Sequence, residues 1–224
     1  MKRIVLAVSM IMLMVGLTAC NKLDVIGDRS IKSFEAVLTA VSGQVSTEDE
    51  FGGWSMEALD QSASFEWSKD FSKTTGYDVR LVADAQPFMD AGLDPAKLPE
   101  GMLVDNQIIV GASLGDDEFT YVGTASPLDA YKKIISNYRD TLSYHAALDH
   151  FGIKMDNGNM FEWAKDMKTN DKDIVFVLNP QPFIDAGVNP DQVEGWAFAK
   201  VEMMDESGNK IQVDKFLKPF DVES

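Results

Sequence analysis

Two glutamates set among aromatic residues are the first candidates for acid–base chemistry. Glu66 is the middle residue of Phe65–Trp67, and Glu162 is the middle residue of Phe161–Trp163. Two carboxylates can act as acid and base on one bond when folding brings them into the same pocket. Each triplet alternates apolar and polar residues as a strand does, so each glutamate points away from its aromatic neighbours. We therefore place both glutamates on a solvated strand face, because glutamate is rarely buried without a partner.

His145 and His150 are the only histidines, and they are the next candidates for metal binding or general-base catalysis. We expect them on a helix, because the stretch Leu142–Phe151 is interpreted as a continuation or second piece of the helix before it, ended by Gly152. At a separation of five residues, two helical side chains differ by about 140° in direction and do not face one ligand. No recognisable serine or cysteine nucleophile motif accompanies them. We interpret both as helix-surface residues.

Three oxygen-rich segments raise the question of calcium: Asp116–Glu118, Asp156–Asn159 and Asn170–Asp173. None has the alternate-residue spacing of a calcium loop followed by a bidentate glutamate. Asn, Asp and Gly favour the backbone of turns, so we predict turns here, with a weak surface calcium site as the alternative. The glycines at 52–53 and 111–115 lack the context of nucleotide-binding loops. The chain is therefore predicted to have no metal centre, no cofactor and no catalytic residue.

Aromatic and methionine side chains offer contact chemistry rather than catalysis. Trp67 and Trp163, like Phe88 and Phe183, stand in segments that recur along the chain, which favours a role in the core. Four residues that have no counterpart are Trp54, Trp196, Met203 and Met204. If exposed, these four would form an adhesive patch for a protein or glycan partner.

The overall composition excludes several function classes. The chain has 224 residues, with 20 Lys and Arg against 36 Asp and Glu, and a net charge of −16. Nucleic acid is excluded as the main partner, because phosphate binding needs clustered Lys and Arg. With 45% hydrophobic and 10% aromatic residues, the chain can bury a core. Its single cysteine excludes a disulfide framework and a multi-cysteine zinc or iron–sulfur site.

The first residues have the pattern of an export signal. Lys2 and Arg3 form a positive region, and the apolar run Ile4–Leu17 is short for a membrane span. The segment Leu17–Cys20 ends in the only cysteine and resembles the lipobox of bacterial lipoproteins. The resemblance implies cleavage before Cys20, a diacylglycerol on its sulfur, and usually an acyl group such as palmitate on its new amine. The alternatives are a plain secretory signal with an incidental cysteine and an N-terminal membrane helix.

A lipid on Cys20 would anchor the mature chain at the extracytoplasmic face of a bacterial membrane. Several acyl chains, each contributing about 0.8 kcal/mol per buried CH₂, hold a protein stably at a bilayer. Removal of the signal peptide, residues 1–19, leaves 18 Lys and Arg against 36 Asp and Glu. We expect an anionic leaflet to repel this body, which would stand off on a lipidated tether over residues 20–27. Asn21 follows the cysteine in place of Asp, and the sorting rule of the lipoprotein family then allows outer-membrane placement in a host with two membranes.

Four sequence blocks recur in the same order along the chain. Phe65–Asp70 matches Phe161–Asp166 at five of six residues, and Gln86–Pro95 matches Gln181–Pro190 at seven of ten. The shorter pairs are Glu100–Gly101 with Glu194–Gly195, and Asn106–Val110 with Asn209–Val213. The offsets run 96, 95, 94 and 103, so the second copy gains about nine residues before Asn209. Matched blocks in one order indicate a tandem duplication.

The duplication predicts one unit over residues 28–115, a linker over 116–124 and a second unit over 125–224. We expect either two small domains or one pseudo-symmetric body, because two copies are too few for a solenoid. The inserted residues make the second closing hairpin the preferred place for an acquired function, since long connections often carry one.

Each unit is predicted to be α+β, with one main helix, about four mainly antiparallel strands and a short helical turn. The main helices follow from apolar residues at helical spacing over 31–41 and from Pro127, with Ser126 as its cap. Strands are predicted at the two aromatic triplets, at Asp78–Ala83 and at Asp173–Leu178, and a hairpin closes each unit. We expect each helix to cover one face of its own sheet.

Pro87 and Pro182 are predicted to start the short helical turns, and Gly92 and Gly187 to end them.

Taken together, these patterns favour a lipid-anchored, non-catalytic binding or envelope-accessory module whose partner is a protein or a polymer. One alternative is the small-molecule-binding lipoprotein of a transporter, which needs a cleft between the two units. The lobes of such proteins have alternating βαβ order, and neither predicted unit has it. The other alternative is a hydrolase of the cell envelope, which needs two carboxylates about 5–9 Å apart in one pocket.

Overall fold

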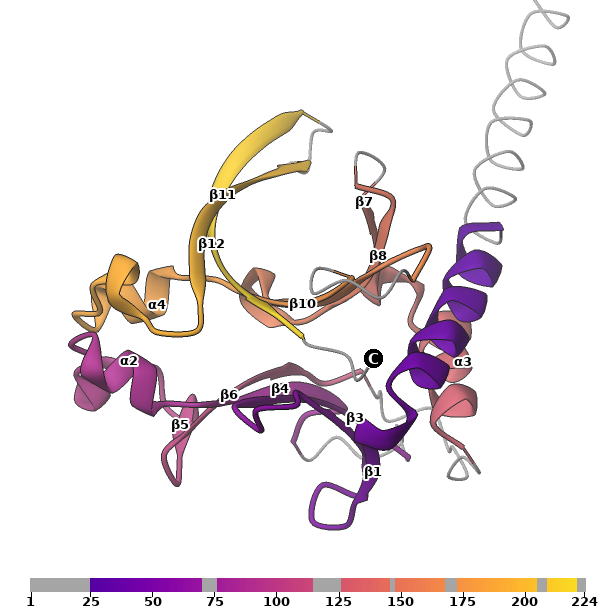
Figure 1. The fold of residues 1–224 in the computed structure, drawn as a ribbon, viewed down its shortest axis with the longest axis horizontal. Coiled ribbons are helices and arrows are strands. Elements are labelled where there is room, and N and C mark those ends of the chain that lie inside the picture. The colour runs from indigo at the N-terminus through magenta and orange to yellow at the C-terminus, as the bar shows by residue number, and fades with distance from the viewer. Residues whose placement is uncertain are drawn as a thin grey trace, which may run out of the picture.

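The computed structural model describes residues 25–69, 76–114, 126–145, 148–167, 173–204 and 209–220. They form two six-stranded antiparallel sheets that lie face to face (Figure 1). The longer helices lie at one end of this sandwich, and the short helices α2 and α4 lie at the other (Figure 1). The predicted α+β composition is confirmed.

The first sheet contains, in spatial order, β1 (Val45–Glu48), β2 (Gly53–Glu57), β3 (Ala63–Ser68), β4 (Val79–Asp84), β6 (Gln107–Ala112) and β5 (Leu103–Val104). The second sheet contains β7 (Leu142–His145), β8 (His150–Lys154), β9 (Met160–Ala164), β10 (Ile174–Leu178), β12 (Lys210–Pro219) and β11 (Ala197–Met204). Both sheets therefore have the same strand order, and every pairing between these strands is antiparallel.

The helices are the one over residues 25–40, α2 (Gln86–Asp90), α3 (Pro127–Asn137) and α4 (Gln181–Asp185). Short 3₁₀ turns are η1 (Ser42–Gln44), η2 (Pro95–Lys97), η3 (Arg139–Thr141), η4 (Asp156–Gly158) and η5 (Pro190–Gln192). Helix α3 begins as predicted, with Pro127 at its start and the Ser126 hydroxyl accepting a hydrogen bond from the backbone N–H of Asp129.

The inner faces of the two sheets form the core. Phe65 on β3 and Phe161 on β9 are fully buried, and their rings stack with centroids 4.3 Å apart and planes 1° apart. Trp67 and Trp163, two residues further along the same strands, are also fully buried. The predicted core role of the matched aromatic residues is confirmed. Because the buried apolar residues of both sheets join in one cluster, the sandwich has a single core.

Matched residues also meet at the end of the sandwich that carries α2 and α4. The rings of Phe88 and Phe183 lie 4.8 Å apart. A reciprocal pair of backbone hydrogen bonds joins the segments that follow: the N–H of Asp94 donates to the carbonyl of Ala186, and the N–H of Asn189 donates to the carbonyl of Ala91, each at 2.8 Å. Such reciprocity is typical of contacts about a two-fold axis.

Gly92 and Gly187 lie at the centre of this contact. Their φ angles are +103° and +98°, a region that residues with a side chain rarely adopt. A Cβ on either glycine would lie 3.1 Å from the carbonyl oxygen of the other. Glycine is therefore required here both by the backbone conformation and by the close approach of the two segments.

Each of the two longer helices contacts the sheet that the other half of the chain forms. Phe34 of helix 25–40 stacks on Tyr131 of α3 at 4.1 Å. The indole N–H of Trp67 donates to the carbonyl of Pro127, whereas the indole N–H of Trp163 donates to Oγ of Ser33, both at 3.1 Å. Each tryptophan is thus bonded to the helix from the other half. The expectation that each helix covers a face of its own sheet is wrong, because the inner face of each sheet packs against the other sheet.

The prediction of about four strands per unit was too low, because it omitted the hairpins β1–β2 and β7–β8. The predicted helical stretch Leu142–Phe151 is instead part of the β7–β8 hairpin. Leu142 pairs with Ile153 and Tyr144 pairs with Phe151, so alternate residues of both strands face the core. This period-two pattern, and the burial it permits, outweighs the weak helical spacing of the same residues.

The strands at the aromatic triplets, the central strands β4 and β10, the glycine-ended turns α2 and α4 and both closing hairpins are confirmed. Residues 25–27, which we assigned to the tether, are helical. Among the described residues, no helix combines the length and the apolar character needed to cross a bilayer. The predicted signal peptide, Cys20, the linker 116–124, the acidic segment Asp116–Glu118 and residues 170–172 lie outside the described residues.

Replacing Phe65 and Phe161 by leucine, singly and together, tests whether the two sheets unfold as one body. Each single change should lower the free energy of unfolding, and the double change should cost less than the sum, because the stacking is lost only once. We expect a coupling of about 0.5–1.5 kcal/mol and one cooperative transition in urea. As a control, Phe65→Leu combined with Phe198→Leu, whose ring contacts Phe216, should be additive within about 0.5 kcal/mol. Additive effects at Phe65 and Phe161, or two transitions, would contradict the single core.

Candidate functional site

The two glutamates first considered are buried, so their predicted place on a solvated face is wrong. Glu66 and Glu162 are each 6% exposed, on the outer faces of β3 and β9. Because Phe65 and Phe161 meet at the centre, the neighbouring glutamates point to opposite sides of the sandwich. The two carboxylates therefore do not converge on one bond.

Glu66 is neutralised within its own sheet. Nε of Arg80, directly opposite on β4, donates to Oε2 of Glu66 at 2.6 Å. The Arg80 guanidinium in turn lies over the Phe51 ring at 4.5 Å. Burial raises the pKa of Glu66, although the charge of Arg80 opposes the shift. Arginine keeps its positive charge near neutral pH, so this ion pair on the outer face of the first sheet has a counter-charge that does not titrate there.

Glu162 has a different counter-charge. Nδ1 of His145, on β7, lies 3.2 Å from Oε1 of Glu162, and neither buried atom has a hydrogen bond of good geometry. The Glu162 carboxylate raises the pKa of His145, while burial of the imidazole opposes this. The contact is therefore an ion pair when His145 is protonated, and it weakens when the imidazole loses its proton.

The two histidines face each other across the β7–β8 hairpin. His145 pairs with His150 in the strand register, so their assignment to a helix surface, about 140° apart, is wrong. Burial lowers the pKa of His150, against the attraction of Glu162. Adjacent positions in an antiparallel pair place the side chains within contact distance of each other. The sequence alone could have suggested this hairpin from the alternation of Leu142, Tyr144, Phe151 and Ile153.

Two further buried charges lie on the same outer face of the second sheet. Asp173 precedes β10, and its buried Oδ2 has no hydrogen-bonding partner. Lys215 of β12 is 6% exposed, and its Nζ donates to the carbonyl of Gly158 at 2.7 Å. Burial lowers the pKa of Lys215, and the charge of Glu162 opposes the shift. We call the set His145, His150, Glu162, Asp173 and Lys215 the polar cluster. Sequence reasoning did not find Asp173 or Lys215 as members, because strand register was needed to bring them together.

The β11–β12 hairpin curls over this outer face toward β7 and β8 (Figure 1). Its cross-strand pairs Val201 with Val213 and Met203 with Ile211 share a face with Lys215. Val201, Met203 and Val213 are half-buried, and Ile211 is 38% exposed. We call these four residues the apolar strip. The opposite face of the hairpin is polar, with ion pairs between Lys200 and Asp214 and between Lys210 and Glu202.

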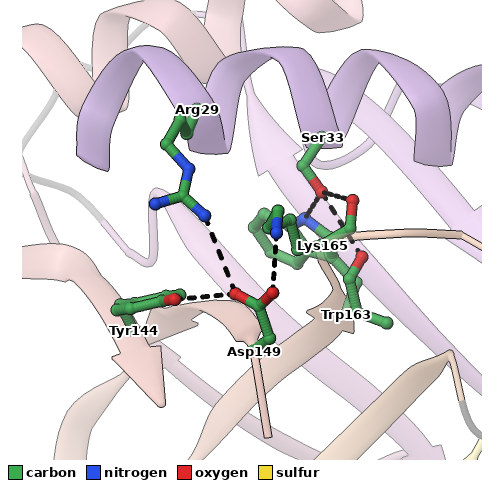
Figure 2. A network of polar contacts seen from close by, with 7 residues as sticks. Arg29, Ser33, Tyr144, Asp149, Trp163 and Lys165 are labelled. Carbon is green, nitrogen blue, oxygen red and sulfur yellow. Dashed lines mark hydrogen bonds and ion pairs between the residues drawn. The ribbon is translucent and has the colours of Figure 1, made fainter. Parts of the chain in front are cut away.

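A second polar network joins the β7–β8 hairpin to helix 25–40 (Figure 2). Asp149, in a left-handed turn conformation beside His150, accepts hydrogen bonds from Tyr144 and Lys165, both at 2.7 Å. Arg29 of helix 25–40 lies 3.8 Å from the same carboxylate. Lys165 and Tyr144 lower the pKa of Asp149, so it carries a negative charge at neutral pH. The network therefore links the turn next to His150 with the first described helix.

The structure does not bring the four predicted contact residues together as an exposed patch. Trp54 is 6% exposed and packs on Trp67, with Nζ of Lys69 5.3 Å from its ring centre. Trp196 is half-buried against Phe88, at the α2 end of the sandwich. Trp54 is therefore not exposed, as the predicted patch required. Met203 belongs to the apolar strip, and the side chain of Met204 lies outside the described part.

The two histidines of the polar cluster can bind and release protons, and its acceptor atoms on Glu162 and Asp173 are buried. Across the described ranges, no group of three or more His, Cys, Asp or Glu side chains is placed to hold a metal ion. The segment Asp156–Gly158 is the 3₁₀ turn η4, with Asn157 at φ +58°, in agreement with the predicted turn.

The chain was compared with protein-family models, with curated proteins and with solved structures, and it matches none of them.

Replacing Glu162 by glutamine should change the titration of both histidines, as measured by NMR of their imidazole signals. In the unchanged chain we expect the pKa of His145 above 6.5 and that of His150 below 6.5. In Glu162→Gln both pKa values should fall, because the carboxylate that favours each protonated form is gone. The matched variant Glu66→Gln, on the other outer face, should move neither. A His145 pKa that stays raised in Glu162→Gln would contradict the ion pair.

The stability of the chain should follow the same two groups. The raised pKa of His145 adds stability below pH 6.5, and this contribution is lost as the pH rises through the pKa of the folded chain. The lowered pKa of His150 removes stability as the pH falls from 6.5 through its folded value. In Glu162→Gln, the stability that protonated His145 adds at low pH should disappear. The loss of stability that His150 causes at low pH should become larger.

Proposed function

We propose that this protein is a lipid-anchored lipoprotein of the bacterial cell envelope that binds a protein or polymer partner. The outer face of the second sheet, formed by the apolar strip and the polar cluster, is the partner-binding surface. The observation that carries the proposal is the exposure of Ile211 at the end of an otherwise half-buried apolar strip, on the same face of β12 as the buried Lys215. Apolar surface bordered by polar groups is typical of protein interaction sites.

The asymmetry between the sheets supports the choice of this face. The strand β5 has two residues, whereas β11, which occupies the same place in the second sheet, has eight. The additional residues of the second copy extend this hairpin and create the apolar strip. A longer connection of this kind is where a duplicated fold gains a binding role.

The tandem duplication is part of the proposal. It is supported by the identical strand order of the two sheets, by the stacking of Phe65 on Phe161, and by the reciprocal backbone hydrogen bonds of Asp94 and Asn189. Two copies of one unit that pack about a two-fold axis bury their shared apolar faces, as the two halves of a symmetric dimer do. The duplicated body then supplies the scaffold, and the second hairpin supplies the function.

The contacts between the sheets weigh against the two alternative functions. Stacked aromatic rings fill the space between the sheets, where a transporter lipoprotein would hold its small molecule. The matched glutamates point to opposite faces, so they do not form the carboxylate pair that a glycosidase-type hydrolase needs. The partner-binding role is therefore the one that the geometry of this body favours.

Photo-crosslinking in intact cells tests the proposed surface. A benzophenone amino acid is placed either at Ile211, on the apolar strip, or at Gln212, an exposed position on the polar side of the same strand. We expect a discrete adduct from position 211 and none from position 212, because neighbouring residues of a strand face opposite sides. Adducts from both positions alike, or partner binding that survives deletion of Met203–Gly208, would contradict the assignment.

The anchor is tested at Cys20. Cells fed a palmitate analogue should label the unchanged protein, and the protein should sediment with membranes. Cys20→Ser should remove both the label and the membrane association, because acyl chains contribute about 0.8 kcal/mol per buried CH₂. A labelled Cys20→Ser protein, or an unchanged protein without label, would contradict lipidation. Crosslinking from position 211 in the Cys20→Ser variant then shows whether partner binding requires the anchor.

A further inference from the structure

One edge strand of the second sheet is long enough to pair with a further strand. The strands at the edges of the two described sheets are β1, β5, β7 and β11. Strands β1 and β7 have four residues each and β5 has two, whereas β11 has eight. Proteins commonly keep edge strands short, because an edge presents unpaired N–H and C=O groups to other chains. Among these four edges, β11 is the exception.

The register of the second sheet shows which amides of β11 its neighbour uses. Successive residues of a strand direct their N–H and C=O groups to opposite edges. The N–H of Phe220, just after β12, donates to the carbonyl of Ile174 in β10. The even-numbered residues of β12 therefore direct these groups toward β10, and the odd-numbered residues direct them toward β11. Val213 accordingly exchanges hydrogen bonds with Val201, the residue opposite it in β11.

The residues on either side of Val201 expose main-chain groups at the free edge. Lys200 and Glu202 direct their N–H and C=O groups away from β12, because the alternation continues without a bulge through eight consecutive pairs. Within the described ranges, no backbone group outside the hairpin is hydrogen-bonded to them. Both residues are also exposed. Unpaired donors and acceptors at this spacing fit the backbone of an extended peptide.

The two faces of β11 define the side chains that such a peptide needs. In an antiparallel pair, opposite residues carry their side chains on the same face. Residues bonded to Lys200 and Glu202 would lie on the polar face, and the residues between them would lie beside Val201 and Met203 of the apolar strip. Apolar residues must therefore alternate with polar ones. The net charge of −16 favours basic polar residues in this peptide and disfavours a second copy of the chain as its source.

We propose that β11 binds an extended segment of the partner protein as an additional antiparallel strand of the second sheet, with apolar side chains toward the apolar strip. The inference rests on the proposed function, which places the partner on this face, and it narrows the partner to a protein with a strand-forming segment. Main-chain hydrogen bonds to Lys200 and Glu202 provide affinity, and the alternate side chains provide selectivity. Antiparallel addition continues the pairing of all the strands in this sheet.

Binding of a synthetic peptide to the protein, purified from cells in mild detergent, tests strand addition. The probe has the length of β11 and blocked ends, and valine alternates in it with threonine or lysine. We expect the fluorescence anisotropy of the labelled probe to saturate at one peptide per chain. The amide hydrogens of Lys200 and Glu202 should then exchange more slowly with D₂O.

Two N-methylated forms of the probe test its orientation. N-methylation of the threonine and lysine residues should weaken binding by about tenfold or more, because it removes the N–H groups that face β11. The same number of N-methyl groups on the valine residues should leave binding intact, since those N–H groups point away from β11.

Two variants at position 200 separate the main chain from the side chain. Lys200→Pro removes an N–H that the pairing with β12 does not use, and edge strands tolerate proline at such positions. We expect it to weaken peptide binding by about tenfold or more while unfolding in urea stays cooperative. The matched control Lys200→Gln keeps the N–H and removes the charge, and it should bind the peptide within about twofold of the unchanged chain.

Absence of peptide binding, or binding that survives either Lys200→Pro or N-methylation at the polar positions, overturns the inference. If Lys200→Pro does not fold, the two N-methylated peptides decide the question. A dimer of the unchanged chain that Lys200→Pro dissociates in sedimentation would assign the edge to a second copy, which also overturns it. Failure of the proposed function has a different signature: no adduct forms from position 211 in cells, although the purified protein binds the peptide.

Discussion

Stacking between Phe65 and Phe161 determines where the other groups of this molecule lie. The two rings, 4.3 Å apart, hold the centres of β3 and β9 against each other. Because side chains alternate along a strand, the residues next to these rings must point outward, which sends Glu66 and Glu162 to opposite faces. Both are nevertheless only 6% exposed, so each outer face must provide a counter-charge.

The two sheets meet this requirement in different ways. Glu66 pairs with Arg80 from the neighbouring strand β4, whereas the residue opposite Glu162 at the corresponding place is Val175. Glu162 instead meets His145, the last residue of β7; the last residue of β1 is Glu48, whose negative charge helps to raise the pKa of Glu66. A permanent cation in one half thus corresponds to a titratable one in the other. The outer face of the second sheet is consequently the one whose charge depends on pH near neutrality.

Much of the local structure could be predicted from the sequence, and the pairings could not. Proline before and glycine after a short apolar run predict α2 and α4, because these residue types restrict or extend φ. The environment of Glu162, by contrast, depends on which residues stand opposite it two strands away. The expectation of a helix at His145 and His150 overlooks the alternation of apolar residues beside them, and the strand register that puts the two imidazoles opposite each other follows from the core that Tyr144 and Phe151 share. Long-range register decides both the burial of the glutamates and the identity of their partners.

The same long-range contacts join the end of the molecule that carries helix 25–40 to its proposed partner surface. Helix 25–40 is hydrogen-bonded to the second sheet, through Ser33 and the buried indole of Trp163, as Figure 2 shows. Its Arg29 also approaches Asp149, the neighbour of His150. The exposed ion pair contributes little by itself, but the buried indole hydrogen bond fixes the helix against the sheet. Helix 25–40, the apolar strip and the polar cluster are therefore parts of one body, and the first half of the chain supplies a helix that supports the binding surface of the second half.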